Sequence, residues 1–166
     1  MLRSWQTEDL DNLVRFANNQ KIAANLTDVF PHPYTRDDGI AFIRASQPDD
    51  LPDTARIFAI EVDGMACGAI GIFPQSDVHR KNAEIGYWLA EEYWGRGIVT
   101  AAVKQTVEYG FSTYDINRIY ARPFSSNRAS QRVLEKAGMK PEARLEKSIV
   151  KNGLLQDELI YSILKP

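Results

Sequence analysis

Residues 56–73 carry two apolar runs, RIFAIEV and MACGAIGIF, and the dipeptide Asp63-Gly64 separates them. A two-residue turn of this composition joins antiparallel strands, because aspartate and glycine accept the positive φ angles that such turns require. The pattern therefore predicts a β-hairpin in the middle of the chain. The apolar side chains of this hairpin must be buried against other elements, which the flanking sequence has to supply.

Two helices are expected before the hairpin, after a short strand at residues 2–5. The first helix spans residues 7–26 with Thr7 as its N-cap, and its apolar face comprises Leu10, Leu13, Val14 and Ala17. Residues 30–34, FPHPY, are expected to be irregular because their two prolines restrict the backbone. Thr35 then caps a second helix over residues 36–46, whose apolar positions are Ile40, Ala41 and Ile43.

Strands and helices mix in the remainder of the chain. A strand is expected at residues 83–90, a helix at 98–111, a strand at 118–124 and a helix at 127–139 that Gly138 ends, followed by a hairpin over 143–164. This order predicts a mixed α/β (α+β) fold around a largely antiparallel sheet. Residues 83–122 form its one strand-helix-strand unit, with a right-handed crossover between parallel neighbours.

Length and charge exclude several classes of protein. With 166 residues, 44% of them hydrophobic, the chain is expected to form a single domain over residues 1–166. A formal net charge of −2 gives no reason to expect nucleic-acid binding. No signal peptide or membrane span is predicted, so we expect a cytoplasmic protein. One cysteine, Cys67, and two histidines make an intramolecular disulfide or a multi-histidine metal centre improbable.

The turn Gly95-Arg96-Gly97 lies between the strand at 83–90 and the helix at 98–111. A dinucleotide fingerprint would need a third glycine, and a phosphate-binding P-loop would need the sequence GK[ST], so neither motif fits. Two interpretations remain. The glycines either turn the chain without further role, or they hold free N–H groups at a helix start against a pyrophosphate, with Arg96 adding charge.

Two segments at a fixed spacing favour the second interpretation. AEIGYWLAEEYWGRGIVTAAV at residues 83–103 and NRASQRVLEKAGM at 127–139 resemble the GNAT superfamily of acetyl-CoA-dependent N-acetyltransferases, in particular its RimJ/RimL-like branch. The resemblance implies a three-layer fold: a seven-stranded, mostly antiparallel sheet with a splayed central strand pair and helices on both faces. It also implies acetyl-CoA as the co-substrate and no metal.

The resemblance assigns coenzyme-binding residues by position. The pyrophosphate would be wrapped by Trp94, Gly95, Arg96, Gly97, Ile98, Val99 and Thr100. The backbone of Trp88, Leu89 and Ala90 would pair with the pantetheine arm, and Asn127, Ser130 and Lys136 would also contact the coenzyme, Lys136 at its 3′-phosphate. Glu92 departs from the family pattern, which places Gln or Arg there. Either its carboxylate points outward, or Arg96 and other cations compensate.

Acetyl transfer requires a neutral amine. Deprotonating a lysine-like amine at pH 7 costs about 4–5 kcal/mol, whereas an α-amino group costs about 1 kcal/mol. Glu84 is the first candidate for the base, because strand alternation places it on one face with Gly86 and Trp88; Asp157 is the second. Ser130 resembles the residue near the thioester sulfur and is the candidate proton donor. Many relatives instead use a tyrosine at the position of Leu134.

The acceptor is expected to be a primary amine, either a protein N-terminal α-amine or a small molecule such as an aminoglycoside, polyamine or amino acid. Its pocket wall is expected to include Phe30, His32 and Tyr34. The net charge disfavours a polycationic acceptor unless the cleft is acidic. A non-catalytic acyl-CoA sensor and a structural interaction module are the alternatives. Cys67 is expected to be a buried structural thiol, and a homodimer is compatible with the resemblance.

Overall fold

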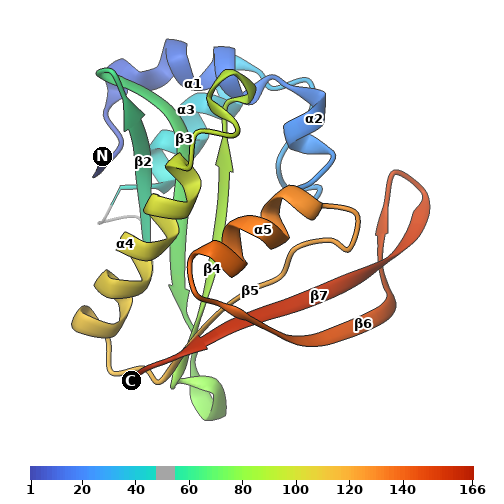
Figure 1. Ribbon diagram of the computed structural model, residues 1–166. Coiled ribbons are helices and arrows are strands. Elements are labelled where there is room, and N and C mark those ends of the chain that lie inside the picture. Colours follow the sequence, from blue (N-terminus) through green and yellow to red (C-terminus); the bar gives the residue numbers. More distant parts are fainter. Residues whose placement is uncertain (48–54) are drawn as a thin grey trace.

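The computed structural model describes residues 1–47 and 55–166. Its centre is a seven-stranded sheet with the strand order β1-β2-β3-β4-β5-β7-β6 (Figure 1). The strands are β1 (Leu2–Arg3), β2 (Arg56–Val62), β3 (Met65–Pro74), β4 (Asn82–Leu89), β5 (Arg118–Ala121), β6 (Lys140–Lys151) and β7 (Leu154–Leu164). Neighbouring strands run antiparallel except β4 and β5, which are parallel. The predicted mixed fold is therefore confirmed.

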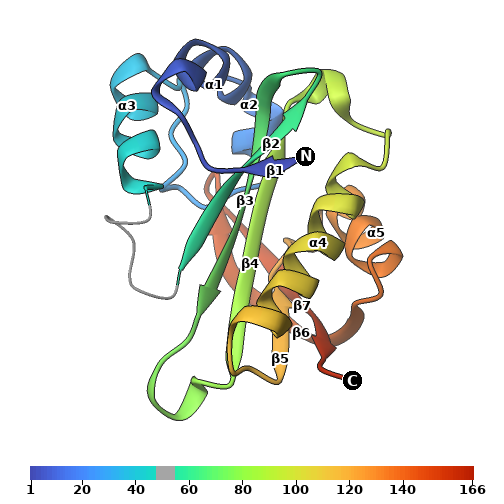
Figure 2. The same ribbon diagram turned by 90° about the vertical axis from the view of Figure 1, so that its left-hand side faces the viewer.

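Helices cover both faces of this sheet. They are α1 (Leu10–Ala17), α2 (Gln20–Ala23), α3 (Arg36–Ala45), α4 (Ile98–Thr113) and α5 (Arg128–Lys136). Figure 2 shows α1 and α3 on one side of the central strands and α4 and α5 on the other. The β6–β7 hairpin extends beyond the helical layers (Figure 1). This three-layer arrangement is the one that the family resemblance implied.

The N-terminal helices differ from the prediction in two respects. Residues 7–26 are divided into a 3₁₀ turn, α1 and α2, because the Asn19 side chain accepts the Lys21 N–H at 2.8 Å and starts a new helix. Thr7 is not an N-cap, since the chain enters through Gln6, whose N–H donates to the Asp9 carboxylate at 2.9 Å. Thr35, in contrast, caps α3 as predicted, accepting the Asp38 N–H at 3.2 Å.

The apolar face of α3 also differs from the prediction. Ile40 is 49% exposed and Ala41 is exposed, whereas Gly39 and Ile43 are buried. A Cβ on Gly39 would lie 2.8 Å from a side-chain carbon of Leu10. The two helices thus pack through a glycine contact, which periodicity of large apolar residues does not reveal.

The hairpins and the central helix follow the sequence pattern. Asp63 and Gly64 have φ angles of 50° and 80°, as the tight turn between β2 and β3 requires. Gly138 follows α5 with a φ of 94°, in the left-handed conformation typical of helix ends. The helix predicted at 98–111 is α4, and one of its faces is buried, through Ala102, Val103, Thr106, Val107 and Gly110.

A gap opens between β4 and β5, the one parallel pair of strands in the described sheet. Their register extends only from Asn82 to Glu84 on β4 and from Arg118 to Tyr120 on β5. Beyond this point β4 continues to Leu89, while β5 ends at Ala121. The second half of β4 therefore has a neighbour, β3, on one edge and no strand on the other, as expected for a splayed pair.

Candidate active site

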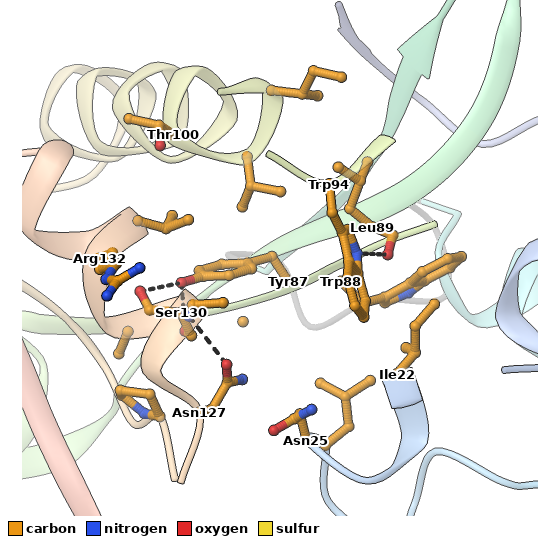
Figure 3. Close-up of a pocket in the computed structure, with 18 of the residues that line it drawn as sticks. Ile22, Asn25, Tyr87, Trp88, Leu89, Trp94, Thr100, Asn127, Ser130 and Arg132 are labelled. Atoms are coloured by element: carbon orange, nitrogen blue, oxygen red, sulfur yellow. Dashed lines mark hydrogen bonds between the residues drawn. The ribbon is translucent and has the colours of Figure 1, made fainter. Parts of the chain in front are cut away.

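A cavity of about 470 Å³ lies at this gap. Its size is within the range of small-ligand sites. The walls come from the second half of β4, the loop that follows it, and the N-terminal parts of α4 and α5, with α2 closing the far side (Figure 3). The cavity thus combines segments that are far apart in the sequence, including both segments that carry the family resemblance.

The glycine turn forms one end of the cavity. Gly95 and Gly97 have φ angles of 75° and 76°, and Gly97 is the N-cap of α4. No side chain caps this helix and its first turn contains no acidic residue. The N–H groups of Ile98, Val99 and Thr100 therefore lack intrahelical acceptors and point out of the helix start. Such an arrangement binds anions, and phosphate groups in particular.

The charged residues of the loop that follows β4, Glu91, Glu92 and Arg96, lie outside the cavity lining. Glu92 approaches Arg15 of α1, with 3.6 Å between the carboxylate and the guanidinium. Arg96 is exposed, and its guanidinium lies 5.4 Å from the ring centre of Tyr93. Of the two alternatives for Glu92, the structure thus favours the outward-pointing carboxylate. The turn itself presents mainly backbone N–H groups to the cavity.

Backbone groups of β4 face the open side of the gap in an alternating pattern. The Ala90 N–H donates to the Cys67 carbonyl of β3 at 2.8 Å, and the Ala90 carbonyl accepts from Tyr93. Both backbone groups of Ala90 thus have partners within the chain and Ala90 does not line the cavity, so the structure does not favour its expected role at a pantetheine arm. By alternation, Trp88 also bonds toward β3, whereas Tyr87 and Leu89 point their N–H and carbonyl groups into the gap. The Leu89 carbonyl accepts the Trp94 indole N–H at 2.7 Å (Figure 3).

The N-terminal part of α5 contributes polar groups. The Asn127 side chain caps this helix by accepting the Ser130 N–H at 3.1 Å, and both side chains line the cavity. Asn127 thus has a structural role, and its Nδ2 amide remains available for a ligand. Lys136, expected at the 3′-phosphate, lines the cavity. Arg132, four residues earlier and therefore on the same side of α5, lines it as well.

Ser130 forms a hydrogen bond with Tyr87 that joins α5 to β4. The two hydroxyl oxygens are 2.7 Å apart, and both residues line the cavity (Figure 3). Burial raises the pKa of Tyr87 to about 12, although the hydrogen bond with Ser130 acts in the opposite direction. Tyr87 therefore carries its proton at neutral pH. Leu134, where many relatives have a tyrosine, is fully buried in the core.

Glu84 lies next to the cavity without lining it. The Tyr120 hydroxyl donates to the Glu84 carboxylate at 3.3 Å. Gly86, two residues further on the same face of β4, lines the cavity, and no atom lies within 4 Å of the place where its Cβ would be. By strand alternation, the open space above Gly86 is on the face of β4 that Glu84 shares, which suits a base that an acceptor approaches from this side.

Asp157, the second candidate for the base, is engaged elsewhere. Its carboxylate accepts the Lys147 N–H at 2.8 Å and the Arg144 side chain at 2.6 Å, in the bulge of β6. These contacts, the Lys147 backbone first, lower the pKa of Asp157. It does not line the cavity. A carboxylate held in this way is a poor proton acceptor, so the structure favours Glu84 over Asp157.

The FPHPY segment reaches the cavity only indirectly. The Phe30 ring packs against Trp88 and Tyr34, with ring centres 5.8 Å and 5.2 Å away. Tyr34 is buried and His32 is exposed, and none of Phe30, His32 and Tyr34 lines the cavity. Cys67 is also remote from it: the thiol is fully buried, and burial raises its pKa to about 11, as expected for a structural residue.

Several lining residues have no signal in the sequence. One group comes from α2 and the residues just after it, and comprises Lys21, Ile22, Asn25 and Leu26. A second group, Arg122 and Pro123, directly follows β5. Tertiary packing alone brings these segments together. Only Arg132 could have been found, because it precedes Lys136 by one helical turn.

The charges around the cavity are predominantly positive. Lys21, Arg122, Arg132 and Lys136 line it, and over residues 1–47 and 55–166 no aspartate or glutamate does. Arg122 pairs with the buried carboxylate of Glu158 at 2.5 Å, and Lys21 pairs with Glu91. Both partner carboxylates lie outside the lining. Arg132 and Lys136, both on α5, have no carboxylate partner among the described residues. Their charges are therefore available to bind a phosphate group of a ligand.

Neither a metal centre nor a membrane-spanning helix is present among the described residues. No group of three or more His, Cys, Asp and Glu side chains is arranged to hold a metal ion in this part of the chain. None of the described helices has both the length and the apolar character needed to cross a bilayer.

Comparison with known proteins gives a consistent result. A family model described as "Acetyltransferase (GNAT) domain" matches residues 1–140. The Bacillus subtilis protein YdaF, named as a candidate ribosomal N-acetyltransferase, is 38% identical over 69% of this chain and 67% of its own length. The Escherichia coli spermidine N(1)-acetyltransferase is 28% identical over 99% of this chain and 85% of its own length.

Solved structures share the fold. The microcin C7 self-immunity acetyltransferase MccE, in complex with acetyl-CoA and AMP, superposes with a TM-score of 0.84 at 28% identity and covers 99% of this chain and 91% of MccE. RimJ of Mycobacterium smegmatis, in complex with CoA-disulfide, has a TM-score of 0.85 at 23% identity over 98% of this chain and 80% of RimJ. Together with the splayed strands, the glycine turn and the match over residues 1–140, these findings show that the chain belongs to the GNAT acetyltransferases, enzymes that take their acetyl group from acetyl-CoA, and that it resembles the RimJ/RimL-like branch.

Proposed function

We propose that this chain transfers an acetyl group to an amine that carries no second positive charge nearby, and that a protein N-terminal α-amine is the acceptor class. The amine attacks directly in a ternary complex, without a covalent enzyme intermediate. The observation that carries the proposal is a cavity that combines free N–H groups at the start of α4 with four cationic side chains and, among the described lining residues, no carboxylate.

The coenzyme end of the site is supported by its donor groups. The N–H groups of Ile98, Val99 and Thr100 would hold the pyrophosphate, with Gly95 and Gly97 leaving room for its close approach. Arg132 and Lys136 are suited to the 3′-phosphate. The backbone of Tyr87 and Leu89 offers hydrogen bonds to the pantetheine arm, and an N–H near Leu89 can stabilise the oxyanion that develops during attack.

The acid–base groups lie on either side of β4. Glu84 accepts the proton that the attacking amine loses, by way of the open space above Gly86. Ser130 donates a proton to the departing sulfur. An α-amine costs about 1 kcal/mol to deprotonate at pH 7, so a base without strong activation is sufficient for it. A lysine-like amine costs about 4–5 kcal/mol and would need a stronger base.

Charge separates the competing acceptors. A polyamine would bring several positive charges to a cavity whose described lining offers no acid to pair with them, and whose cations Arg132 and Lys136 have no carboxylate partner among the described residues, so its binding is disfavoured. The relatives include both a spermidine acetyltransferase and a candidate ribosomal acetyltransferase. The lining of this chain favours the second type of acceptor.

Three acceptors test the proposal in a thiol-release assay with acetyl-CoA. They are a neutral peptide with a free α-amine, the same peptide with an acetylated α-amine and one added lysine, and spermidine. We expect kcat/KM to be highest for the free α-amine, by about tenfold or more. A preference for spermidine would refute the proposed acceptor class. Glu84→Gln and Ser130→Ala should lower kcat/KM while the Kd for coenzyme A, measured by calorimetry, stays within about twofold.

The sensor alternative predicts a different outcome. A non-catalytic acyl-CoA sensor would bind coenzyme A without thiol release for any of the three acceptors. A structural interaction module would bind no coenzyme. Calorimetry and the thiol assay on the wild-type chain therefore distinguish all three functions.

A further inference from the structure

The hydrogen-bonded hydroxyls of Tyr87 and Ser130 connect β4 to α5 beside the gap. Tyr87 comes from the open half of β4, and Ser130 lies in the first turn of α5, 43 residues later. Their oxygens are 2.7 Å apart, and either can be the donor. A second contact of 3.4 Å joins the Tyr87 hydroxyl to the Ser130 carbonyl. Both side chains line the cavity, so this hydrogen bond is part of its wall.

Leu134 occupies the α5 position at which many relatives have a tyrosine, so no phenol is available from that position. Leu134, one turn after Ser130, is 0% exposed and belongs to the core. A serine hydroxyl alone is a weak proton donor, because donating leaves an alkoxide that nothing neutralises. The Tyr87 phenol, directly behind Ser130, can remove this penalty by moving its own proton to the serine oxygen.

We propose, on the basis of the proposed function, that Tyr87 is a positioning residue for Ser130 and the source of the proton that Ser130 delivers. The bond between the acetyl carbon and the sulfur breaks, and its electron pair goes to the sulfur. The Ser130 hydroxyl proton bonds to the sulfur, and the Tyr87 proton moves to the serine oxygen. Water then reprotonates the Tyr87 phenolate, which balances the proton that the amine releases through Glu84.

The surroundings of Tyr87 support this role. Burial raises its pKa to about 12, so the phenol stays protonated at neutral pH and is available as a donor. The single Tyr87 phenol proton can be directed at the Ser130 hydroxyl, at 2.7 Å, or at the Ser130 carbonyl, at 3.4 Å, and the shorter contact is the one along which the proton would move. This hydrogen bond holds the two hydroxyls together in the cavity wall (Figure 3).

Tyr87→Phe tests the proposal, because it removes one hydroxyl and keeps the ring. We expect the single-turnover rate constant for acetyl transfer to fall about tenfold or more, while the Kd for coenzyme A and the melting temperature stay close to wild type. Ser130→Ala should cost at least as much. The double variant should be no slower than Ser130→Ala within about twofold, since Tyr87 acts only through Ser130.

The chain provides a matched control. Tyr161 is also buried, and its hydroxyl donates at 3.0 Å to Glu135 of the same helix, outside the cavity lining. Tyr161→Phe should transfer acetyl groups at the wild-type rate. If both tyrosine variants lose activity equally, the effect of Tyr87 is the anchoring of α5 and the proposal is wrong.

A proton inventory distinguishes proton transfer from Tyr87 through Ser130, which we call the relay, from a purely structural role of Tyr87. In mixtures of H₂O and D₂O, the single-turnover rate of the wild type should curve downward because two protons move together, and that of Tyr87→Phe should be linear. A linear plot for the wild type, or an unchanged rate for Tyr87→Phe, would overturn the relay. A wild-type chain that acetylates no amine would instead refute the proposed function, and with it this inference, before any variant is compared.

Discussion

Gly97→Ala probes whether the left-handed turn is what makes the anion site. Gly97 has a φ of 76°, and no atom lies within 4 Å of an added Cβ. The cost of the change is therefore backbone strain alone, about 1–2 kcal/mol for a residue with a side chain in this conformation. For a domain of this size, that cost corresponds to a fall in melting temperature of about 2–8 °C.

Gly64→Ala is the matched control for this experiment. Gly64 has a φ of 80° and equally open surroundings, but it lies in the β2–β3 turn, outside the cavity lining. Both variants should lose similar stability. Only Gly97→Ala should weaken coenzyme A binding, because relaxing the strain moves the N–H groups that follow, and one lost hydrogen bond to a charged group is worth about 1.5–3 kcal/mol.

Calorimetric titration with coenzyme A and thermal unfolding by circular dichroism measure the two effects. The expected rise in Kd for Gly97→Ala is about 10- to 100-fold, against less than about twofold for Gly64→Ala. Unchanged coenzyme affinity in Gly97→Ala, with the expected loss of melting temperature, would show that the turn does not position the binding groups. Unchanged stability in both variants would refute the strain argument itself.

Three further predictions concern other contacts. Arg132→Gln and Lys136→Gln should each raise the Kd for coenzyme A and reduce its dependence on salt concentration, whereas Lys104→Gln, outside the cavity lining, should do neither. Coenzyme A should change the tryptophan emission of Trp5→Phe as much as that of the wild type and that of Trp94→Phe less, because the Leu89 carbonyl that Trp94 binds faces the gap, whereas Trp88, which also lines the cavity, is present in both variants. Burial alone would raise the pKa of Asp9, but hydrogen bonds from Arg3 and from the Gln6 N–H outweigh burial and lower it. Asp9→Asn should therefore reduce the free energy of unfolding at pH 7, and the difference from wild type should shrink as the pH falls below about 4, because the unfolded carboxylate takes up a proton there while the native one, with its lowered pKa, does so only at more acidic pH; a difference that grows in acid would contradict this.

The Glu92 position illustrates how local sequence and tertiary packing divide the information. Its departure from the family pattern raised the question of a negative charge beside a phosphate. The structure answers it by packing α1 near the loop, so that Arg15 draws the carboxylate away from the cavity. Residue 15 lies far from residue 92 in the sequence, and no periodicity connects them.

Local sequence determined the elements of this protein. Turn chemistry at Asp63-Gly64 and the two apolar runs beside it defined the central hairpin, and the free amides at the start of α4 follow from Gly97 and the absence of a capping side chain. These features depend on neighbours within a few residues, so the sequence alone predicts them. The family motifs added the coenzyme and the splayed strands.

Only the tertiary structure decided which side chains meet. The 43-residue separation of Tyr87 and Ser130, the closure of the cavity by α2, and the burial of Gly39 instead of Ile40 all depend on how elements dock. Docking is set by close packing between surfaces that are remote in the chain, and a glycine contact or a buried leucine at position 134 changes it without altering any local pattern. For this reason the glycine turn at residues 95–97 could be located from the sequence, while the hydrogen-bond partner of Ser130 and the charge of the cavity lining could not.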